Sequence, residues 1–290
     1  MTNPPVRHYS LLIAPMVIIM GAVIGWPLIR TLMLSFTDAT MMGLNPISFV
    51  GLSNFQKAFS DSGFISALKI SLIFAVSVVT IEMMLGTTVA LLVNEPFKGR
   101  NILRALLILP WAIPTVVNAI MWRLIYNPEY GALNSLLTQM GLIDSYISWL
   151  GNPDKALVAI IFADVWKNFS LVALIALASL QSLSSAQMEA AKIDGANAIQ
   201  RFGYITLPHI IPSLQVALVL RIIEAVKVFD IIYIMTKGGP ANKTRSGSIF
   251  VYQEAFTNSR MGSGAAFAVI MVSLIVILIL FYMRILMKKK

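Results

Sequence analysis

The sequence predicts an all-α, polytopic membrane protein with six transmembrane helices. Two properties of its composition support this prediction: 58% of the 290 residues are hydrophobic, and only 12% are charged. A soluble domain has about 25% charged residues, so this chain has too few for a surface that faces only water. In addition, six segments are each long and apolar enough to cross a bilayer. They are residues 11–36, 64–93, 105–126, 156–180, 209–236 and 262–286.

No long polar region separates these segments, and we therefore expect residues 1–290 to form a single transmembrane domain. The first segment is longer than the core of a cleavable signal peptide and has no small-residue cleavage site after it, so we expect it to be retained as a span. In the third segment, Pro110 and Pro114 predict a kinked helix. Pro208 is expected to separate the fifth span from the region before it, and Gly238, Gly239 and Pro240 to end that span.

The positive charge of the chain predicts its orientation in the membrane. The formal net charge is +9, but the basic residues form no single cluster, which argues against nucleic-acid binding. Short flanks on one side of the predicted spans carry Arg7, Lys98, Arg100, Arg104, Lys192, Arg201, Arg284, Lys288, Lys289 and Lys290. Longer loops on the other side carry Lys57, Lys155, Lys237, Lys243, Arg245 and Arg260. Because basic residues are retained at the cytoplasmic face, both termini are predicted to be cytoplasmic in a multi-pass membrane protein.

The sequence contains no pattern typical of an enzyme. There is no cysteine, and His8 and His209 have no metal-ligand spacing to another His. The stretch from Gly239 to Thr244 lacks the glycine that a phosphate-binding loop requires before Lys243, and it follows a predicted helix instead of a strand. We therefore expect no ATP hydrolysis, bound metal or cofactor in this chain.

Ionisable residues within the predicted spans indicate a candidate substrate path. Such residues are costly in a membrane and normally face the interior of a helix bundle or a water-filled cavity. The fourth span contains Asp164 and Lys167, and the fifth contains Arg221, Glu224, Lys227 and Asp230 at intervals of three residues. The path is predicted to include Asp164, Trp166, Lys167, Asn168, Arg221, Glu224 and Phe229.

Two readings of this charged region remain open. In one, the charges form an ion-pair seam between two helices, with Lys227 and Asp230 as members; in the other, they line a path for a carbohydrate, whose hydroxyl groups bind such side chains. The charges of Asp164, Lys167, Arg221 and Glu224 cancel, which favours a neutral ligand over an anion.

A polar stretch of about twenty residues between the fourth and fifth spans predicts a helix, a turn and a second helix at a membrane surface. Ser184, followed by Gln187, matches the pattern of a capping box that begins a helix. Gly195 is expected to end that helix with a positive φ.

The residues of this stretch carry a resemblance to a known family. Glu189, Ala190, Ala191 and Gly195, followed by Ile205, Leu207 and Pro208, have the spacing of the EAA loop of permease subunits in binding-protein-dependent ABC importers. The chain resembles the carbohydrate-uptake permeases of the maltose and glycerol-phosphate type, and most closely the first of their two permeases. Further similarity lies at Val50 to Phe55, Arg104 to Pro110, Pro114 to Trp122, Gly131 with Asn134, Phe229 with Asp230, and Thr236 to Pro240 with Thr244.

This resemblance implies a heteromeric importer in the cytoplasmic membrane of a prokaryote. Its other parts would be a second, related permease, two ATPase subunits that use ATP and Mg²⁺, and an extracytoplasmic solute-binding protein that delivers a sugar. Residues 184–208 would be a cytoplasmic coupling loop that docks on an ATPase subunit, with contacts from Glu189, Ala190, Ala191, Asp194 and Gly195.

Three alternatives differ from this hypothesis in stated ways. An importer of an anionic polyol phosphate would share everything except the chemistry of the cavity, with Lys167 and Arg221 as anion ligands. An ion-coupled secondary transporter would use the intramembrane carboxylates but would leave the spacing around Glu189 unexplained. A membrane enzyme would require a catalytic pair at membrane depth, and the sequence contains no convincing one.

Overall fold

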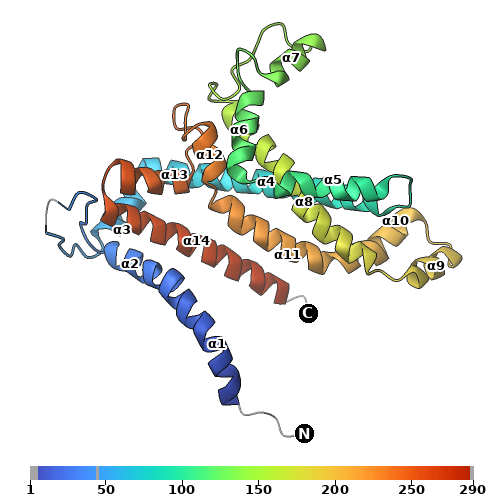
Figure 1. The fold of residues 1–290 in the computed structure, drawn as a ribbon, viewed down its shortest axis with the longest axis horizontal. Coiled ribbons are helices and arrows are strands. Elements are labelled where there is room, and N and C mark those ends of the chain that lie inside the picture. The colour runs from blue at the N-terminus through green and yellow to red at the C-terminus, as the bar shows by residue number, and fades with distance from the viewer. Residues whose placement is uncertain (1–5, 44–45, 288–290) are drawn as a thin grey trace. The chain divides into compact units, whose positions relative to one another are not determined.

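The computed structural model describes residues 6–43 and 46–287. The chain divides into two compact units, Met1–Ile65 with Phe250–Lys290, and Ser66–Ile249. Apart from an isolated bridge between Thr37 and Phe49, the regular structure of the described residues is helical (Figure 1). The all-α prediction is therefore confirmed.

The first unit contains a long N-terminal helical run and the C-terminal helix. The run consists of α1 (Val6–Met20), the π-helical turn η1 (Gly21–Gly25) and α2 (Trp26–Leu34), and the candidate span within it, Ile13–Leu34, is 0% buried. The short helix α3 (Ser53–Ser60) and α2 both pack against α14 (Met261–Met287). The segment after α2 also approaches α14: a Cβ atom on Gly262 would lie 1.9 Å from the carbonyl oxygen of Thr37, so only glycine fits.

The buried carboxylate of Glu254 connects α3, α14 and the turn before α14 in the first unit. Glu254, in the π-helical turn η3 (Gln253–Thr257), is 5% exposed. It accepts hydrogen bonds from Lys57 Nζ on α3 at 3.0 Å, from Ser263 Oγ on α14 at 2.9 Å and from Asn258 Nδ2 at 2.9 Å. Burial raises the pKa of Glu254, but these hydrogen bonds and the charge of Lys57 outweigh it and leave the pKa below its ordinary value of 4.5.

The second unit contains the remaining helices. Most of α4 (Ser62–Asn94) belongs to it, together with α5 (Arg100–Ala112), α6 (Thr115–Ile125), α7 (Ala132–Gln139), α8 (Ala156–Gln181), α9 (Ser185–Ile193), α10 (Ala198–Arg201), the π-helical turn η2 (Phe202–Thr206), α11 (Leu207–Val226) and α12 (Asp230–Met235). The second unit ends within the helix α13 (Gly247–Tyr252). Helix α8 packs against α5, α6, α11 and α12 and contributes Ile160, Ala163 and Val165 to the core. Because α7 precedes α8 and α9 follows it, these two short helices lie at opposite ends of α8 (Figure 1).

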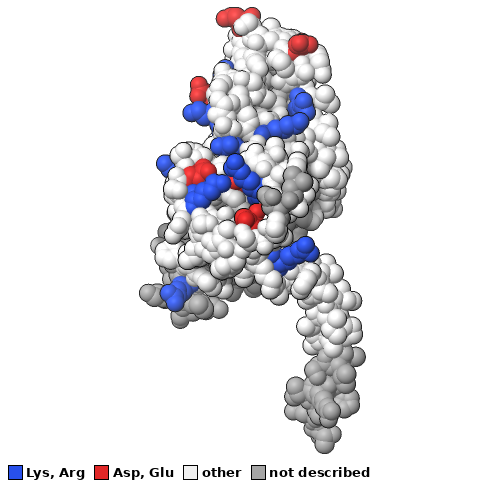
Figure 2. Space-filling model, turned by 90° about the vertical axis from the view of Figure 1, so that its left-hand side faces the viewer, with Lys and Arg blue, Asp and Glu red and all other residues white. Residues whose placement is uncertain are grey.

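The predicted spans agree with the structure with two corrections. Among the described residues, five helices are long and apolar enough to cross a membrane, and a sixth span results if the bent pair α5 and α6 is counted as one. On the face shown in Figure 2, uncharged side chains cover most of the described surface, as expected for a protein in contact with lipid. Lys288, Lys289 and Lys290, used for the orientation, lie outside the described residues.

The first correction concerns the third span, which is not one kinked helix over residues 105–126. Helices α5 and α6 meet at 94°. The break lies at Ile113, whose backbone is extended, and Pro114 caps the start of α6. A proline excludes the helical conformation for the residue before it, which accounts for the break at this position, whereas Pro110 is accommodated within α5.

The second correction concerns the fifth span, which does not begin after Pro208 or continue to residue 236. One helical run extends from Ala198 to Val226. Pro208 lies in the first turn of α11, directly after η2, where the shift in hydrogen-bond register accommodates its missing N–H. The run ends at Val226, and hydroxyl groups of Ser246 and Ser248 donate to the carbonyl oxygens that the break exposes on Val228 and Lys227.

The predicted helix–turn–helix between the fourth and fifth spans is present. Gly195 has a φ of +78° and follows α9, as predicted. Ser184 does precede α9, but its side chain makes no capping hydrogen bond, so the predicted capping box is wrong. The capping box forms instead at the second helix, where Asn197 and Gln200 exchange hydrogen bonds of 2.9 and 2.8 Å.

Candidate functional site

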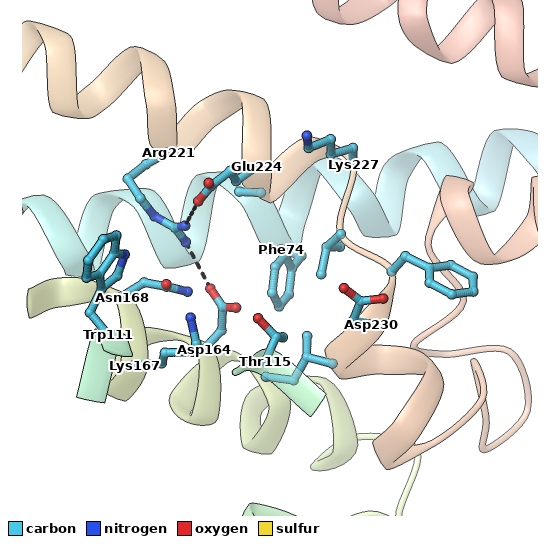
Figure 3. A pocket seen from close by; sticks show the side chains of 14 residues that line it. Phe74, Trp111, Thr115, Asp164, Lys167, Asn168, Arg221, Glu224, Lys227 and Asp230 are labelled. Atoms are coloured by element: carbon cyan, nitrogen blue, oxygen red, sulfur yellow. Dashed lines mark hydrogen bonds and ion pairs between the residues drawn. The ribbon is translucent and has the colours of Figure 1, made fainter. Parts of the chain in front are cut away.

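A polar cavity of about 280 Å³ lies within the second unit, where α4, α8 and α11 meet the break between α5 and α6 (Figure 3). The break matters here because it places Trp111, near the end of α5, and Thr115, at the start of α6, in the cavity wall. The wall is formed by Phe74, Trp111, Thr115, Asp164, Lys167, Asn168, Arg221, Glu224, Ala225, Lys227, Val228, Phe229, Asp230 and Ile231.

Close packing of α4 on α8 positions the charged groups beside this cavity. A Cβ atom on Gly86 would lie 2.7 Å from the carbonyl oxygen of Phe169 and 2.7 Å from Cβ of Val172, so glycine is required for the two helices to approach this closely. Glu82 is one turn before Gly86 and therefore lies on the same face of α4. On α8, Asp164 and Asn168 share a face with Val172 for the same reason.

Arg221 is the centre of an ion-pair cluster that joins three helices. Its guanidinium binds Glu82 of α4 in a bidentate manner, with Nε to Oε2 at 2.7 Å and Nη2 to Oε1 at 2.9 Å. Nη2 also donates to Asp164 Oδ2 of α8 at 3.1 Å, and Nη1 donates to Glu224 Oε2, one turn further along α11, at 2.5 Å. The side chains of Arg221 and Glu82 are 2% and 0% exposed, so this charge pair is removed from solvent.

The contacts of Arg221 explain how charged side chains are tolerated in the interior of the second unit. A guanidinium has five N–H groups, and Arg221 uses four of them on carboxylates. Removing one partner from such a buried cluster would leave an uncompensated charge, which costs about 3–5 kcal/mol. The cluster is therefore an ion-pair seam, as one of the two sequence readings predicted, and its most buried carboxylate is Glu82.

Sequence reasoning missed Glu82, Trp111 and Thr115 as members of this site. Glu82 is an acidic residue within a predicted span, and the rule that identified Asp164 and Glu224 would also have identified it. Trp111 and Thr115 enter the site only through the break between α5 and α6, which the sequence predicted as a kink.

The predicted path residues do not all lie in the cavity wall. Asp164, Lys167, Asn168, Arg221, Glu224 and Phe229 do. Trp166 is outside this set: its ring packs edge-to-face on Trp122 with centroids 5.9 Å apart.

The predicted charge stripe of the fifth span is only half correct. Arg221 and Glu224 pair along α11, but the helix ends before Lys227, and Asp230 begins α12. Among the residues that the structure describes, neither Lys227 nor Asp230 forms an ion pair, which differs from their predicted place in the seam.

The residues of the predicted coupling loop lie on α9 and in the turn after it. Glu189, Ala190, Asp194 and Gly195 are exposed, and Ala191 is half-buried. Large apolar side chains nearby are also exposed, with Ile193 at 86% and Ile199 at 82%. The stems of the loop are held together by His209, whose Nε2 lies 3.0 Å from Ser182 Oγ and 3.1 Å from the carbonyl oxygen of Ser179.

In the second unit, membrane-spanning helices surround a charged cavity and an exposed helix–turn–helix follows α8, an arrangement typical of a membrane transport subunit. The chain belongs to the family described as binding-protein-dependent transport system inner membrane component, whose model matches residues 82–290. The expected membership of this family is thereby confirmed, as is the multi-pass membrane location. Membership of a family of transport permeases also argues against two of the alternatives, a membrane enzyme and an ion-coupled secondary transporter.

Relatives of known name support this assignment over nearly the whole chain. The trehalose/maltose transport system permease protein MalF of Thermococcus litoralis is 38% identical, over 95% of this chain and 92% of the relative. The sulfoquinovosyl glycerol transport system permease protein SmoG of Agrobacterium fabrum is 34% identical, over 96% of this chain and 90% of the relative.

The fold is also found in solved structures. A chain of a bacterial ABC transporter that imports the acidic polysaccharide alginate superposes with a TM-score of 0.84, covering 96% of this chain and 94% of its own, at 24% identity. A second structure of the bacterial alginate transporter, in complex with a pentasaccharide-bound periplasmic protein, gives a TM-score of 0.83 over 95% and 92% of the two chains, at 23% identity. These matches support the fold of the permease.

Proposed function

We propose that this chain is a permease subunit of an ATP-driven, binding-protein-dependent importer of sugars. Relatives with 38% and 34% identity over more than nine-tenths of the chain are named for the transport of trehalose and maltose and of sulfoquinovosyl glycerol. The chain would form half of the translocation pathway, and the cavity beside Arg221 would be part of that pathway. It is not itself an enzyme, and ATP hydrolysis resides in separate subunits.

The observation that carries the sugar assignment is the composition of the cavity wall. Amide, hydroxyl and carboxylate groups of Asn168, Thr115 and Asp230 can bond the hydroxyl groups of a carbohydrate, and the ring of Trp111 offers a flat apolar surface for a sugar ring. Trp111 is 44% exposed in the chain, so part of its surface is available for such a contact.

Charge balance favours a neutral sugar. The cavity wall and Glu82 behind it carry three cationic and four anionic side chains, and Arg221 already binds three of the carboxylates. An anion would therefore approach a site whose charges sum to a small negative value, which is unfavourable. An anionic polyol phosphate remains the second candidate because Lys167 and Lys227, which are not engaged in ion pairs with described residues, also line the wall.

The coupling of this permease to ATP hydrolysis is proposed to run through α9 and the turn after it. Exposed Glu189 can accept charge-assisted hydrogen bonds from an ATPase subunit, and the small side chains of Ala190 and Ala191 allow close approach of the helix to a groove. Asp194 and Gly195 complete this surface. Exposed Ile193 and Ile199 supply apolar area that a partner subunit would bury.

The remaining parts of the complex follow from this proposal. A second, homologous permease would complete the pathway, two ATPase subunits would bind ATP and Mg²⁺, and an extracytoplasmic binding protein would deliver the sugar. Both termini of this chain would be cytoplasmic, which the excess of basic residues in the short flanks supports and which places α9 where an ATPase can reach it.

The test is the ATPase activity of the co-expressed complex in lipid, with its binding protein, across neutral oligosaccharides and polyol phosphates. Stimulation by a neutral oligosaccharide is the expected result. Stimulation only by a polyol phosphate would keep the importer and replace the sugar with an anion. An intact complex that none of the ligands stimulates would contradict the proposed coupling.

A further inference from the structure

Two of the three cations in the cavity wall, Arg221 and Lys167, are nearly buried, and the structure gives them different surroundings. Arg221 is 2% exposed and spends four of its five N–H groups on carboxylates. Lys167 is 9% exposed, yet its ammonium group forms no ion pair and no hydrogen bond with any residue that the structure describes. Figure 3 shows its nitrogen directed into the cavity beside Asp164, whose Oδ2 already accepts from Arg221.

Lys167 Nζ is not among the fully buried polar atoms that lack a partner, so its ammonium group is open to the cavity, where water or a ligand can accept from its N–H groups. Lys227, which also lines the cavity, is exposed to solvent. The donors of Lys167 therefore remain available to a molecule that enters the cavity, whereas those of Arg221 do not.

We infer that Lys167 is the cavity cation that contacts the transported sugar, and that Arg221 instead holds α4, α8 and α11 in place. This inference rests on the proposed sugar importer. Lys167 donates hydrogen bonds to hydroxyl or ring oxygens of the sugar, and the amide of Asn168, the next residue along α8, is available beside it. Arg221 acts as a positioning residue that fixes Asp164, one turn of α8 before Lys167 and Asn168.

The ligand class follows from the neighbours of Lys167. A neutral sugar satisfies its N–H groups without adding charge, whereas a phosphate or carboxylate would also face Glu224 and Asp230 across the same cavity. Removing the ammonium group should lower the uptake of a neutral sugar about tenfold or more, which corresponds to the loss of a hydrogen bond to a charged group.

The experiment compares variants of the complete complex reconstituted in lipid vesicles with its binding protein, using maltose and trehalose as probes. Two quantities are measured for each variant: sugar uptake, which requires passage through the cavity, and ATPase stimulation by the loaded binding protein, which does not require Lys167. Lys167→Met should lower uptake about tenfold while ATPase stimulation stays within about twofold. Lys167→Arg should restore part of the uptake, because it returns the positive charge and the donors.

A matched control separates contact from charge or stability. Lys155, at the start of the same helix, lies outside the cavity wall, and Lys155→Met should leave uptake within about twofold of the wild type. Uptake by Lys167→Met within the same range, or a loss of uptake that only matches a loss of assembled complex, would overturn the assignment of Lys167. A wild-type complex that takes up none of the neutral oligosaccharides tested above would instead contradict the proposed function.

Discussion

The guanidinium group of Arg221 and the carboxylate of Glu82 form a bidentate ion pair, at 2.7 and 2.9 Å, between residues 139 positions apart in the chain. Since both side chains are almost completely buried, each depends on the other for its charge to be tolerated. Asp164 extends the pair to α8, so one guanidinium fixes the relative positions of three helices around the cavity.

Replacing one partner of this pair should destabilise the protein more than replacing both. Arg221→Met leaves Glu82 and Asp164 buried without a cation and is expected to cost about 3–5 kcal/mol. The double variant Arg221→Met with Glu82→Leu removes both charges of the pair, leaves Asp164 without its Arg221 contact, and should recover part of that loss. Thermal unfolding of the purified complex measures both effects, and equal destabilisation in the double and single variants would contradict the mutual dependence.

Reversing the charge at Glu189 should separate transport from membrane insertion. Glu189→Lys replaces an exposed acceptor on α9 with a cation, so a docking contact with an ATPase subunit is lost while the fold is left intact. We expect uptake to be abolished and the amount of chain in the membrane to be unchanged. Glu129→Lys, on an exposed turn outside α9, is the matched control and should transport normally. Normal uptake by Glu189→Lys would disprove the coupling role.

The close approach of α4 to α8 should make Gly86 intolerant of even one added methyl group. Gly86→Ala would place a Cβ atom 2.7 Å from atoms of Phe169 and Val172. We expect a loss of about 1–3 kcal/mol, because neither backbone can move away without disturbing the Glu82 contact. Gly203 in η2 has nothing within 4 Å of such an atom, and Gly203→Ala is the control. It should leave thermal stability unchanged or raise it by about 0.5–1 kcal/mol. Similar melting temperatures for the two variants would argue against tight packing at Gly86.

Glu254 should make part of the stability of the first unit depend on pH. Because the folded state lowers the pKa of this carboxyl below 4.5, its stabilising contribution is complete above that value and is lost as the pH falls through the lower, folded pKa. Glu254→Gln should therefore lower the melting temperature at neutral pH and flatten its decline on acidification below about pH 4.5. An unchanged pH profile in Glu254→Gln would show that other carboxylates govern the acid response.

The spans and the intramembrane charges were predictable from the sequence because both follow from local physical rules. Apolar length identifies α4, α8 and α14 almost to the residue, and the cost of a charge in a membrane identifies Asp164, Lys167 and Arg221 as facing a polar interior. Gly195 was also predictable, since a helix that ends in a tight turn favours a residue with positive φ.

What could not be predicted depends on contacts between distant segments or on backbone angles that a pattern does not determine. Pro110 and Pro114 predict a kink in the third span. They do not show that the two helices meet at 94° or that this break brings Trp111 and Thr115 into the cavity. The sequence also does not show that Arg221 binds Glu82 on α4 in addition to Asp164 and Glu224. That contact depends on how closely α4 approaches α8 at Gly86.

The helical run from Ala198 to Val226 begins in the turn of the proposed coupling loop and ends beside the cavity. Gln200 and Arg221 therefore lie on one continuous helical run and are separated by about 30 Å along its axis. A displacement that a partner imposed at the loop end would move the guanidinium, and through Glu82 and Asp164 two further helices. The chain would then need no separate relay between the proposed coupling loop and the cavity, because the same helical run reaches both.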